Sequence, residues 1–488
     1  MSTPAASVET TGTLVAGELV VDGSSDPIEV LDPADLRRVV GRVPAMGPAE
    51  LQRVFDAAER AAPSWRSAGH IARGEVLRET ANRLRADAGR LTELVVREMG
   101  KTRAEAAVEV VKAADFFEYY AGLCRLPFGQ LLPDARPGTL ASVRHEPLGV
   151  VLLITPWNDP LLTPARKLAP ALAAGNADVV KPATNTPLIV LELARILQAA
   201  GLPDGVLNTV TGRGAEIGDS LLDHPSLRAV SFTGSTPVGL HLQRQLAGRQ
   251  IRMQTEMGGK NATAVLATAD LDAAARAIAA GAFAQAGQRC TATARVAVRD
   301  VADGLVAGLV ELAGEIRVGS GLAEGVTMGP VVSREHRDQV VEHVERAVAE
   351  RAHVLTGGSA APAGAPEYGA FVAPTVLRAE PGQRIWQDEV FGPVLAVYEV
   401  ADEQEALQAV NDSSYGLSSS VFTNDLGAAE RFVEGVETGQ VSVNQPTTGW
   451  DVHHPFGGFR DSGSPFKEQG LDALQFYTRT KTVAQWFL

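Results

Sequence analysis

From Glu146 to about Asn444 the sequence alternates between short apolar runs and segments whose apolar residues have helical spacing. In its first part the predicted strands are Gly149–Ile154, Ala177–Val180, Val206–Thr211 and Arg228–Phe232, and the helices that follow them are Pro164–Ala174, Pro187–Ala200, Ala215–Leu222 and Pro237–Leu246. The alternation resumes with a strand at Thr263–Leu266, a helix near Leu271–Ala286 and a strand at Arg295–Val298. Strands separated by helices form βαβ units, and therefore a parallel sheet covered on both faces. The predicted fold is α/β, with two doubly wound α/β domains.

The segments outside this alternation have other patterns. A helical pattern runs from about Leu51 to Leu91, and a second helix is predicted from Ala104 to Tyr120. The stretch Leu126–Ala141 is rich in proline and glycine and has no helical period, so it is interpreted as an excursion between helical and β/α parts. Gln475–Leu488 is apolar and β-branched at a chain terminus. A terminal strand of this kind has an edge that needs a partner, which predicts a subunit contact.

The composition excludes several classes of protein. The chain has 488 residues with 45% hydrophobic and 21% charged residues, which is enough apolar material for large cores. Its formal net charge of −14 repels phosphate backbones and anionic lipids, so neither a nucleic acid nor a membrane surface is a predicted partner. The longest strongly apolar run, Leu148–Ile154, is far shorter than the roughly 20 residues of a membrane span.

The cysteine and histidine content indicates the redox compartment of the protein and whether it has a metal site. The two cysteines, Cys124 and Cys290, cannot build a cysteine-rich zinc site or a disulfide framework. The nine histidines include one adjacent pair, His453-His454, without further ligands at suitable spacing, so no metal site is predicted. Met1–Gly23 contains no Lys or Arg and no apolar core of a signal peptide. These features predict a reduced, cytoplasmic protein.

Two glycine clusters follow predicted strands. Gly212-Arg213-Gly214 is followed by Gly218, which is one residue off the dinucleotide-binding fingerprint, and a plain strand-to-helix turn is the alternative. Gly234 and Gly239 have the spacing of a P-loop, but Leu240-His241 replaces the Lys-Ser/Thr that would contact phosphate and Mg²⁺. The pattern therefore excludes an NTPase. What remains is a helix N-terminus suited to a pyrophosphate or to a tight turn.

Three residues have the chemistry and position of catalytic groups. Cys290 follows a predicted helix end beside Arg289, so its pKa could be lowered and the thiol could act as a nucleophile; a buried structural thiol is the alternative. Glu256 ends a predicted strand before two glycines and is either a base facing a cleft or a solvated acid in a turn. Asn158 follows a strand and could donate to an anion, or serve as a turn residue. Cys124 has no such neighbours and is interpreted as a packing residue.

Taken together, eight segments resemble the aldehyde dehydrogenase superfamily through most of the chain. They are Pro156-Trp157-Asn158, Lys181-Pro182-Ala183, Phe232-Thr233-Gly234-Ser235-Thr236, Glu256-Met257-Gly258-Gly259-Lys260, Gly287-Gln288-Arg289-Cys290, Glu389-Val390-Phe391-Gly392-Pro393, Tyr415-Gly416-Leu417 and Pro455-Phe456-Gly457-Gly458. The resemblance implies a cofactor domain of residues 1–125 and 145–257, a catalytic domain of 258–456, and a small β element of 126–144 and 457–488. The last would join subunits into a homodimer or homotetramer.

The resemblance also implies a catalytic sequence. Cys290 would attack the aldehyde carbonyl and form a thiohemiacetal, while the Asn158 amide and the Cys290 N–H hold the oxyanion. Loss of hydride to the nicotinamide would leave a thioester. Glu256 would activate a water molecule to hydrolyse it, and Lys167 and Glu468 would relay protons to and from that base.

NAD or NADP is the implied cofactor. Lys181 would bond the adenosine ribose, Ser235 the pyrophosphate and Glu389 the nicotinamide ribose, with Phe391 nearby. The remaining implied contacts are Thr155, Pro156, Trp157, Ala183, Thr184, Gly214, Phe232, Gly234 and Met257. Thr184 stands where many NAD-preferring members have a glutamate, which removes a charge that would repel a 2′-phosphate. The sequence therefore leans slightly towards NADP; a helix-capping role for Thr184 is the alternative.

The implied substrate channel departs from the family pattern. Asp159 stands where a Phe is common and Arg166 where many members have a Trp, which predicts a polar or charged aldehyde. Arg166 or Arg289 could bind a carboxylate, as in semialdehyde dehydrogenases, and the tail resembles the 2-oxoglutarate-semialdehyde branch. Alternatively, Asp159 and Arg166 neutralise each other and point elsewhere.

Other substrates and activities stay open from the sequence. An aromatic aldehyde could stack on a wall formed by Trp157, Trp450, Phe456 and Phe459. A CoA-acylating enzyme would keep Cys290, although Glu256 favours hydrolysis. A scaffold protein without activity is disfavoured because Cys290, Glu256 and Asn158 are all present.

Overall fold

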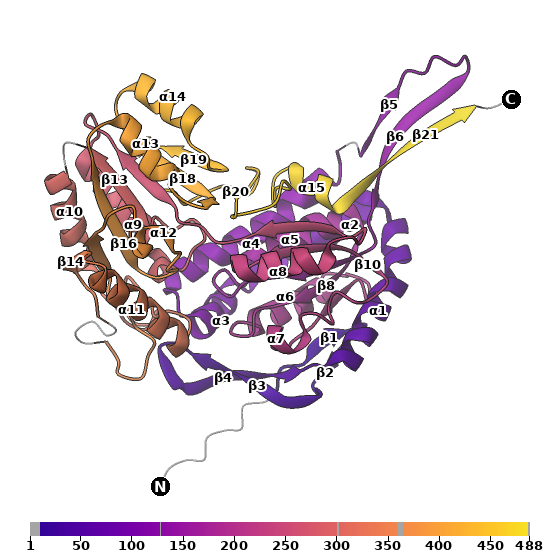
Figure 1. Ribbon diagram of the computed structural model, residues 1–488. Coiled ribbons are helices and arrows are strands. Elements are labelled where there is room, and N and C mark those ends of the chain that lie inside the picture. Colours follow the sequence, from indigo (N-terminus) through magenta and orange to yellow (C-terminus); the bar gives the residue numbers. More distant parts are fainter. Residues whose placement is uncertain (1–9, 127, 300–301, 360–364, 487–488) are drawn as a thin grey trace, which may run out of the picture.

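The computed structural model describes residues 10–126, 128–299, 302–359 and 365–486. It has two lobes, each built around its own largely parallel sheet, and a β arm that extends away from both (Figure 1). The predicted α/β class with two doubly wound sheets is confirmed. In the described part of the chain no helix has the length and apolarity to cross a membrane.

The first sheet is entirely parallel, in the order β11-β10-β7-β8-β9. Its strands are β7 (Val150–Ile154), β8 (Ala177–Lys181), β9 (Leu207–Thr209), β10 (Leu227–Thr233) and β11 (Arg252–Glu256). The helices between them are α5 (Leu162–Ala174), α6 (Leu188–Ala199), α7 (Gly214–Ile217) and α8 (Thr236–Leu246). Separate apolar clusters cover the two faces of this sheet. The strand order reverses between β7 and β10, and the loops after these two strands diverge at that point, which opens a crevice at the carboxyl edge of the sheet.

Four helices precede this sheet. They are α1 (Pro48–Ser67), α2 (Gly69–Ala86), α3 (Ala88–Met99) and α4 (Arg103–Leu123). The continuous helical pattern from Leu51 to Leu91 is therefore broken twice. At the first break Gly69 has a φ of 82°, a conformation that glycine adopts without a steric penalty and that lets the chain change direction. Two short hairpins lie before α1, β1 (Thr13–Val15) with β2 (Glu18–Val20), and β3 (Ser25–Asp32) with β4 (Asp35–Ala45).

The second sheet has the order β14-β15-β16-β13-β12-β18-β19 and is parallel except at β14. Its strands are β12 (Ala262–Val265), β13 (Arg295–Arg299), β14 (His353–Thr356), β15 (Thr375–Arg378), β16 (Val394–Val400), β18 (Ser418–Phe422) and β19 (Gln440–Val443). The helices of this lobe are α9 (Leu271–Phe283), α10 (Ala302–Glu315), α11 (Arg334–Ala349), α12 (Arg384–Gln387), α13 (Glu403–Asn411) and α14 (Leu426–Gly435). A 3-10 turn, η1 (Ala284–Gly287), follows α9, and β17 (Tyr415–Gly416) pairs with β20 (Phe459–Arg460).

The arm joins two distant parts of the sequence. β5 (Gly129–Leu132) and β6 (Thr139–Pro147) form a hairpin in the proline- and glycine-rich stretch, and β21 (Thr478–Trp486) pairs along β6. Figure 1 shows these strands standing off the body of the molecule. The predicted terminal strand begins later than expected, because α15 (Asp472–Tyr477) occupies its first residues; residues 487–488 lie outside the described residues.

Buried carboxylates start two of the helices that cover the first sheet. Glu109 on α4 accepts the backbone N–H groups of Leu161 and Leu162 at 2.8 and 3.0 Å, where α5 begins. Glu98 on α3 accepts those of Leu188 and Ile189, where α6 begins. A helix N-terminus has unsatisfied N–H groups and attracts negative charge, so each carboxylate fixes the helix above it. The α5 helix carries Arg166 and Lys167 and is thus held at its site-bearing end.

Candidate active site

Two chambers meet at Cys290. The first, a cavity of about 240 Å³, lies at the carboxyl edge of the first sheet. Seven predicted cofactor residues line it: Pro156, Trp157, Gly234, Ser235, Met257, Glu389 and Phe391. The second, of about 200 Å³, is lined by Lys101, Lys112, Phe116, Asp159, Arg166, Arg289, Trp450 and Phe456, among others. Both chambers include Cys290, Asp159 and Arg166 in their walls.

Cys290 is held by contacts from both lobes. Its carbonyl accepts a hydrogen bond from Asn261 Nδ2 at 2.8 Å, and Asn158 Nδ2 donates to the Gln288 carbonyl at 3.0 Å. An amide nitrogen has two N–H groups, so Asn158 keeps a second donor next to the cysteine loop. The expectation of a lowered thiol pKa is wrong for this state. Burial raises the pKa of Cys290, and the nearby Arg166 offsets that effect only in part.

Glu256 ends β11 but lines neither chamber. A Cβ atom at Gly457 would lie 2.7 Å from its Oε1, so the carboxyl points towards that glycine. Both carboxyl oxygens are buried without a hydrogen-bond partner in the described structure. Burial, and then repulsion by Glu468, raise the pKa of Glu256 well above its usual range. The structure thus brings Glu256 near the cysteine but not into the cavity that holds it.

Lys167 and Glu468 form a buried pair beside Glu256. Lys167 Nζ donates to Glu468 and, at 2.8 Å, to Ser231 Oγ, while Thr233 Oγ1 donates to Glu468 at 2.8 Å. Burial acts to raise the pKa of Glu468, but Lys167 and Arg166 together lower it below its usual range. Glu468 is therefore an anion held among cations, next to a Glu256 carboxyl that burial keeps protonated.

Asp159 and Arg166, the predicted channel residues, do not pair with each other. Arg166 Nε lies 3.2 Å from Glu468 Oε2, and its guanidinium lies 4.9 Å from the centre of the Phe456 ring. Asp159 instead accepts from Lys101 Nζ at 3.0 Å. The idea that Asp159 and Arg166 neutralise each other is thus wrong. Both still line the second chamber, as predicted for channel residues.

Two further sequence expectations need correction. The predicted aromatic wall is divided, since Trp450 and Phe456 line the second chamber whereas Trp157 lines the first. Phe459 is half exposed on β20 and lines neither. Lys167 lines neither chamber, because it is buried against Glu468. The cations that line the second chamber with Arg289 are Lys101, Lys112 and Arg166.

The first chamber suits the ribose and planar ring of a nicotinamide nucleotide. Glu389 accepts the Gly259 N–H at 2.8 Å, and a Cβ atom at Gly258 would lie 2.2 Å from its other carboxyl oxygen. Trp157 and Phe391 meet edge-on with ring centroids 5.3 Å apart. His336 Nε2 donates to the Phe391 carbonyl at 2.8 Å, which supports the left-handed φ of 55° at Phe391. Aromatic faces next to a carboxylate give stacking surface and hydroxyl acceptors in one cavity.

The other predicted cofactor residues do not line this chamber. Lys181 ends β8, the next strand along the sheet edge, and Ala183 follows it; Gly214 lies on the surface at the start of α7. Burial lowers the pKa of Lys181 to about 8, and its Nζ donates to the Pro182 carbonyl at 3.0 Å.

The last three predicted cofactor residues are in contact with other parts of the protein or are buried. They are Thr184, Thr155 and Phe232. Thr184 Oγ1 donates to the Gly212 carbonyl at 3.4 Å. The Thr155 hydroxyl is buried without a partner in the described structure. Phe232 packs beneath Gly234, where a Cβ atom would lie 2.6 Å from its ring.

Several residues at the site were not among the predicted site residues. Lys101, Asn261, Gln285, Gln288 and His336 contact the predicted residues directly. Gln285 and Gln288 lie in the short segment before Cys290, so their spacing could have drawn attention to them. Lys101 follows Gly100 at a helix end, and nothing local indicates that its ammonium group reaches Asp159.

A switch-point crevice with aromatic and carboxylate walls, joined to a cavity around a cysteine, defines a dinucleotide-dependent enzyme with a thiol at its reaction centre. Comparison with known proteins agrees. The model of the "Aldehyde dehydrogenase family" matches residues 20–483, and the chain belongs to that family. It is an NAD(P)-dependent aldehyde dehydrogenase, an oxidoreductase.

Named relatives cover nearly the whole chain. "Alpha-ketoglutarate semialdehyde dehydrogenase" of Haloferax volcanii is 44% identical over 96% of this chain and 98% of its own length. "2,5-dioxopentanoate dehydrogenase" of Saccharolobus solfataricus is 39% identical over 95% and 97%. The crystal structure of betaine aldehyde dehydrogenase from Staphylococcus aureus in complex with NAD+ has a TM-score of 0.94 and 32% identity, covering 97% of this chain and 94% of that chain.

Glu389 predicts a pH dependence of cofactor binding. Its half-buried position raises its pKa to about 7, so the carboxyl ionises as pH rises through that value and then accepts hydroxyl hydrogens at both oxygens. Lys181, with a pKa of about 8, stays largely protonated over the same interval. We expect the Kd of NAD(P)⁺ to fall several-fold between pH about 6 and about 7.5, measured by calorimetry. In Glu389→Gln the Kd should be nearly independent of pH, and an unchanged slope in that variant would contradict the assignment.

Proposed function

We propose that this enzyme oxidises a short aldehyde that carries a carboxylate, of the 2-oxoglutarate-semialdehyde class, to the dicarboxylic acid. The observation that supports this most is the chamber on the substrate side of Cys290, whose wall includes Arg289, Lys112 and Arg166. An arginine provides paired N–H donors that match a carboxylate. Two relatives at 44% and 39% identity are named for substrates of this kind.

The proposed mechanism begins at the thiol. The Cys290 sulfur forms a bond to the aldehyde carbon, and its proton passes to the Glu256 carboxylate after that group has lost its own proton to the Lys167–Glu468 pair. The second N–H of Asn158 and the Cys290 backbone N–H stabilise the oxyanion, with roughly 3–4 kcal/mol for each such donor in comparable sites. Bound NAD(P)⁺, held by Glu389, Phe391 and Ser235, supplies the hydride acceptor. Cys290 is left with a thioester.

Hydrolysis of the thioester requires a base. Glu256 first gives up its proton to the Lys167–Glu468 pair. As a carboxylate it turns from its packed position near Gly457 towards the cysteine, takes a proton from water and so directs the hydroxide at the acyl carbon. The raised pKa of Glu256 suits a group that must hold and then release a proton. Lys167 and Glu468, which lie in contact behind it, pass that proton on. The presence of this base favours water over CoA as the acceptor of the acyl group.

Of the two arginines, Arg289 is the better anchor for the substrate carboxylate. Arg166 is ion-paired with Glu468, so part of its charge is already balanced inside the protein. Arg289 donates its Nε to Gln285, which orients the guanidinium and leaves its terminal nitrogens for a ligand. It also directly precedes Cys290 in the chain and lines the same chamber.

Cys290→Ala tests the reaction class. The variant should lose aldehyde oxidation by several orders of magnitude. Its Kd for NAD(P)⁺ should stay within about twofold, since the thiol forms only a small part of the cofactor chamber's wall. Initial rates and calorimetric titration measure the two quantities. Cys124→Ala is the matched control and should keep wild-type rates. Substantial turnover in the Cys290 variant would refute the mechanism.

Arg289→Met tests the substrate class. We expect kcat/KM for a carboxylated semialdehyde to fall roughly 10- to 100-fold, since a charged hydrogen-bonding partner is lost, and kcat/KM for hexanal or benzaldehyde to change little. Arg125→Met, which removes an exposed arginine paired with Glu75, serves as the control. Equal losses for charged and neutral aldehydes would contradict a carboxylate anchor. A wild-type preference for benzaldehyde would support the aromatic alternative built on Trp450 and Phe456.

We also propose that NADP⁺ is accepted and slightly preferred over NAD⁺. Thr184 stands where many NAD-preferring members of the family have a glutamate, whose charge would repel a 2′-phosphate, and Lys181, three residues before it, is a candidate partner for that phosphate. Thr184→Glu should therefore shift the ratio of kcat/KM towards NAD⁺ by about tenfold or more, measured with both cofactors at one aldehyde concentration. A strong wild-type bias to NAD⁺ would refute the proposal.

The arm supports a proposal on assembly. Leu131 and Trp486 expose 75% and 63% of their surface on strands that stand off the body. Large exposed apolar side chains on an open sheet favour pairing with a second copy. We infer a homodimer or a homotetramer in the cytoplasm, where the two cysteines, both free in the described structure, would stay reduced.

A further inference from the structure

The nucleophile follows a turn in an unusual backbone conformation. Gln285, Ala286 and Gly287, just after α9, have φ values of 53°, 56° and 70°. Gly287 is required there, because a Cβ atom would lie 2.1 Å from the Gly392 carbonyl oxygen. Gln285 and Ala286 have side chains and disfavour this region. Such residues persist only where their surroundings hold them, and they gather at functional sites.

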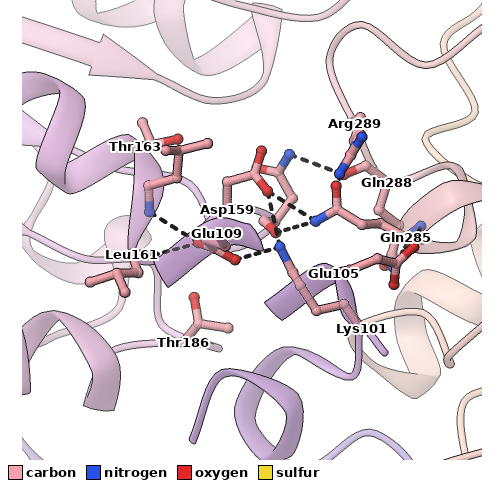
Figure 2. A network of polar contacts seen from close by, with 12 residues as sticks. Lys101, Glu105, Glu109, Asp159, Leu161, Thr163, Thr186, Gln285, Gln288 and Arg289 are labelled. Carbon is pink, nitrogen blue, oxygen red and sulfur yellow. Dashed lines mark hydrogen bonds and ion pairs between the residues drawn. The ribbon is translucent and has the colours of Figure 1, made fainter. Parts of the chain in front are cut away.

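Gln285 is the residue of this turn that contacts its surroundings most. Its backbone N–H donates to Glu105 Oε1 on α4 at 2.7 Å. Its side-chain Nε2 donates to Asp159 Oδ1 at 2.9 Å, and its Oε1 accepts from Arg289 Nε. Its carbonyl accepts from Gln288 Nε2 at 2.8 Å. Figure 2 shows Gln285 between Asp159, Glu105 and Arg289, so contacts from three segments converge on it.

Asp159 is itself held by a buried ion cluster. Lys101 Nζ donates to Asp159 Oδ1 at 3.0 Å and to Glu109 Oε2 at 2.6 Å, and Lys101 and Glu109 are almost fully buried. Glu109 accepts the N–H groups that begin α5. Arg289 faces Asp159 from the other side and favours its charge. The cluster, which comprises Lys101, Glu109 and Asp159, thus ties helix α4 to the segment that begins α5 and, through Gln285, to the cysteine loop (Figure 2).

We propose that Asp159 is a positioning residue that holds Gln285, and through it the left-handed turn, so that Cys290 is correctly placed against the amide of Asn158. Asn158 and Asp159 are adjacent in the chain, so one short segment carries both the oxyanion donor and the anchor of the nucleophile loop. The Asn158 carbonyl also accepts from Gln285 Nε2 at 3.4 Å. Small displacements between such groups slow a reaction strongly, because the reacting atoms must meet in a narrow geometry. The proposal rests on Cys290 as the nucleophile.

Asp159→Ala and Asp159→Asn test it together. The alanine variant should lower kcat by about tenfold or more and leave the KM for NAD(P)⁺ within about twofold. The asparagine variant keeps an oxygen for Lys101 and Gln285 and should recover most of the rate. The loss should be the same for a carboxylated semialdehyde and for hexanal. A loss confined to the charged aldehyde, or an asparagine variant as slow as the alanine variant, would overturn the proposal.

A double-mutant cycle with Gln285→Ala tests the route of the effect. If Asp159 acts through Gln285, adding Asp159→Ala to the Gln285→Ala enzyme should lower kcat only slightly more. The two effects on kcat are then strongly non-additive. Additive effects would overturn the proposal. If Cys290→Ala is inactive and Asp159→Ala is as fast as wild type, the positioning role alone fails. If Cys290→Ala still turns over, it is the proposed function that fails.

Glu98→Gln controls for loss of stability. Glu98 accepts two backbone N–H groups at the start of α6, as Glu109 does at α5, and in the described structure no hydrogen bond or ion pair joins it to the cluster residues. The variant should lower Tm and leave kcat unchanged. A similar fall of kcat in Glu98→Gln at an equal loss of Tm would attribute the Asp159 effect to stability and overturn the proposal.

Discussion

The need to balance buried charge organises the region where the two lobes meet. An ionised group that loses its partner in a protein interior costs several kcal/mol. Here Lys167 and Arg166 meet Glu468, and Lys101 meets Glu109 and Asp159, all largely buried. Several of these pairs join residues that are distant in sequence, and Lys167 and Glu468 are 301 positions apart. The ion pairs therefore determine how the first sheet, helix α4 and the C-terminal segment lie around the cysteine.

The same burial keeps the reacting groups neutral. Both Cys290 and Glu256 have raised pKa values, although cations lie close to each. A protonated thiol is a weak nucleophile, and a neutral carboxyl is not a base. Both groups must therefore lose a proton before they act in the proposed reaction.

Much of the fold was predictable from local pattern. The strands and helices after Glu146 occur in the predicted order, with ends shifted by a few residues, because burial on both faces leaves continuous apolar runs that are hard to misread. That the loops after β7, β10 and β11 lie close together could be predicted from the sequence, since the carboxyl ends of neighbouring parallel strands share one edge of the sheet. The break at Gly69 and the helix at Asp472–Tyr477 were missed, because a single glycine or a six-residue helix changes a periodic pattern little.

The order of elements and the chemical types at the strand ends thus followed from the chain alone, as did membership of the aldehyde dehydrogenase family. The partners of the charged residues did not. Sequence spacing suggested that Asp159 would meet Arg166, whereas Asp159 contacts Lys101, 58 residues away, and Arg166 contacts Glu468. Likewise, Arg289 beside Cys290 suggested an acidic thiol, but burial dominates and raises its pKa. Charge pairing and pKa depend on distance through space and on exclusion of water, and both arise only when segments far apart in the chain pack together.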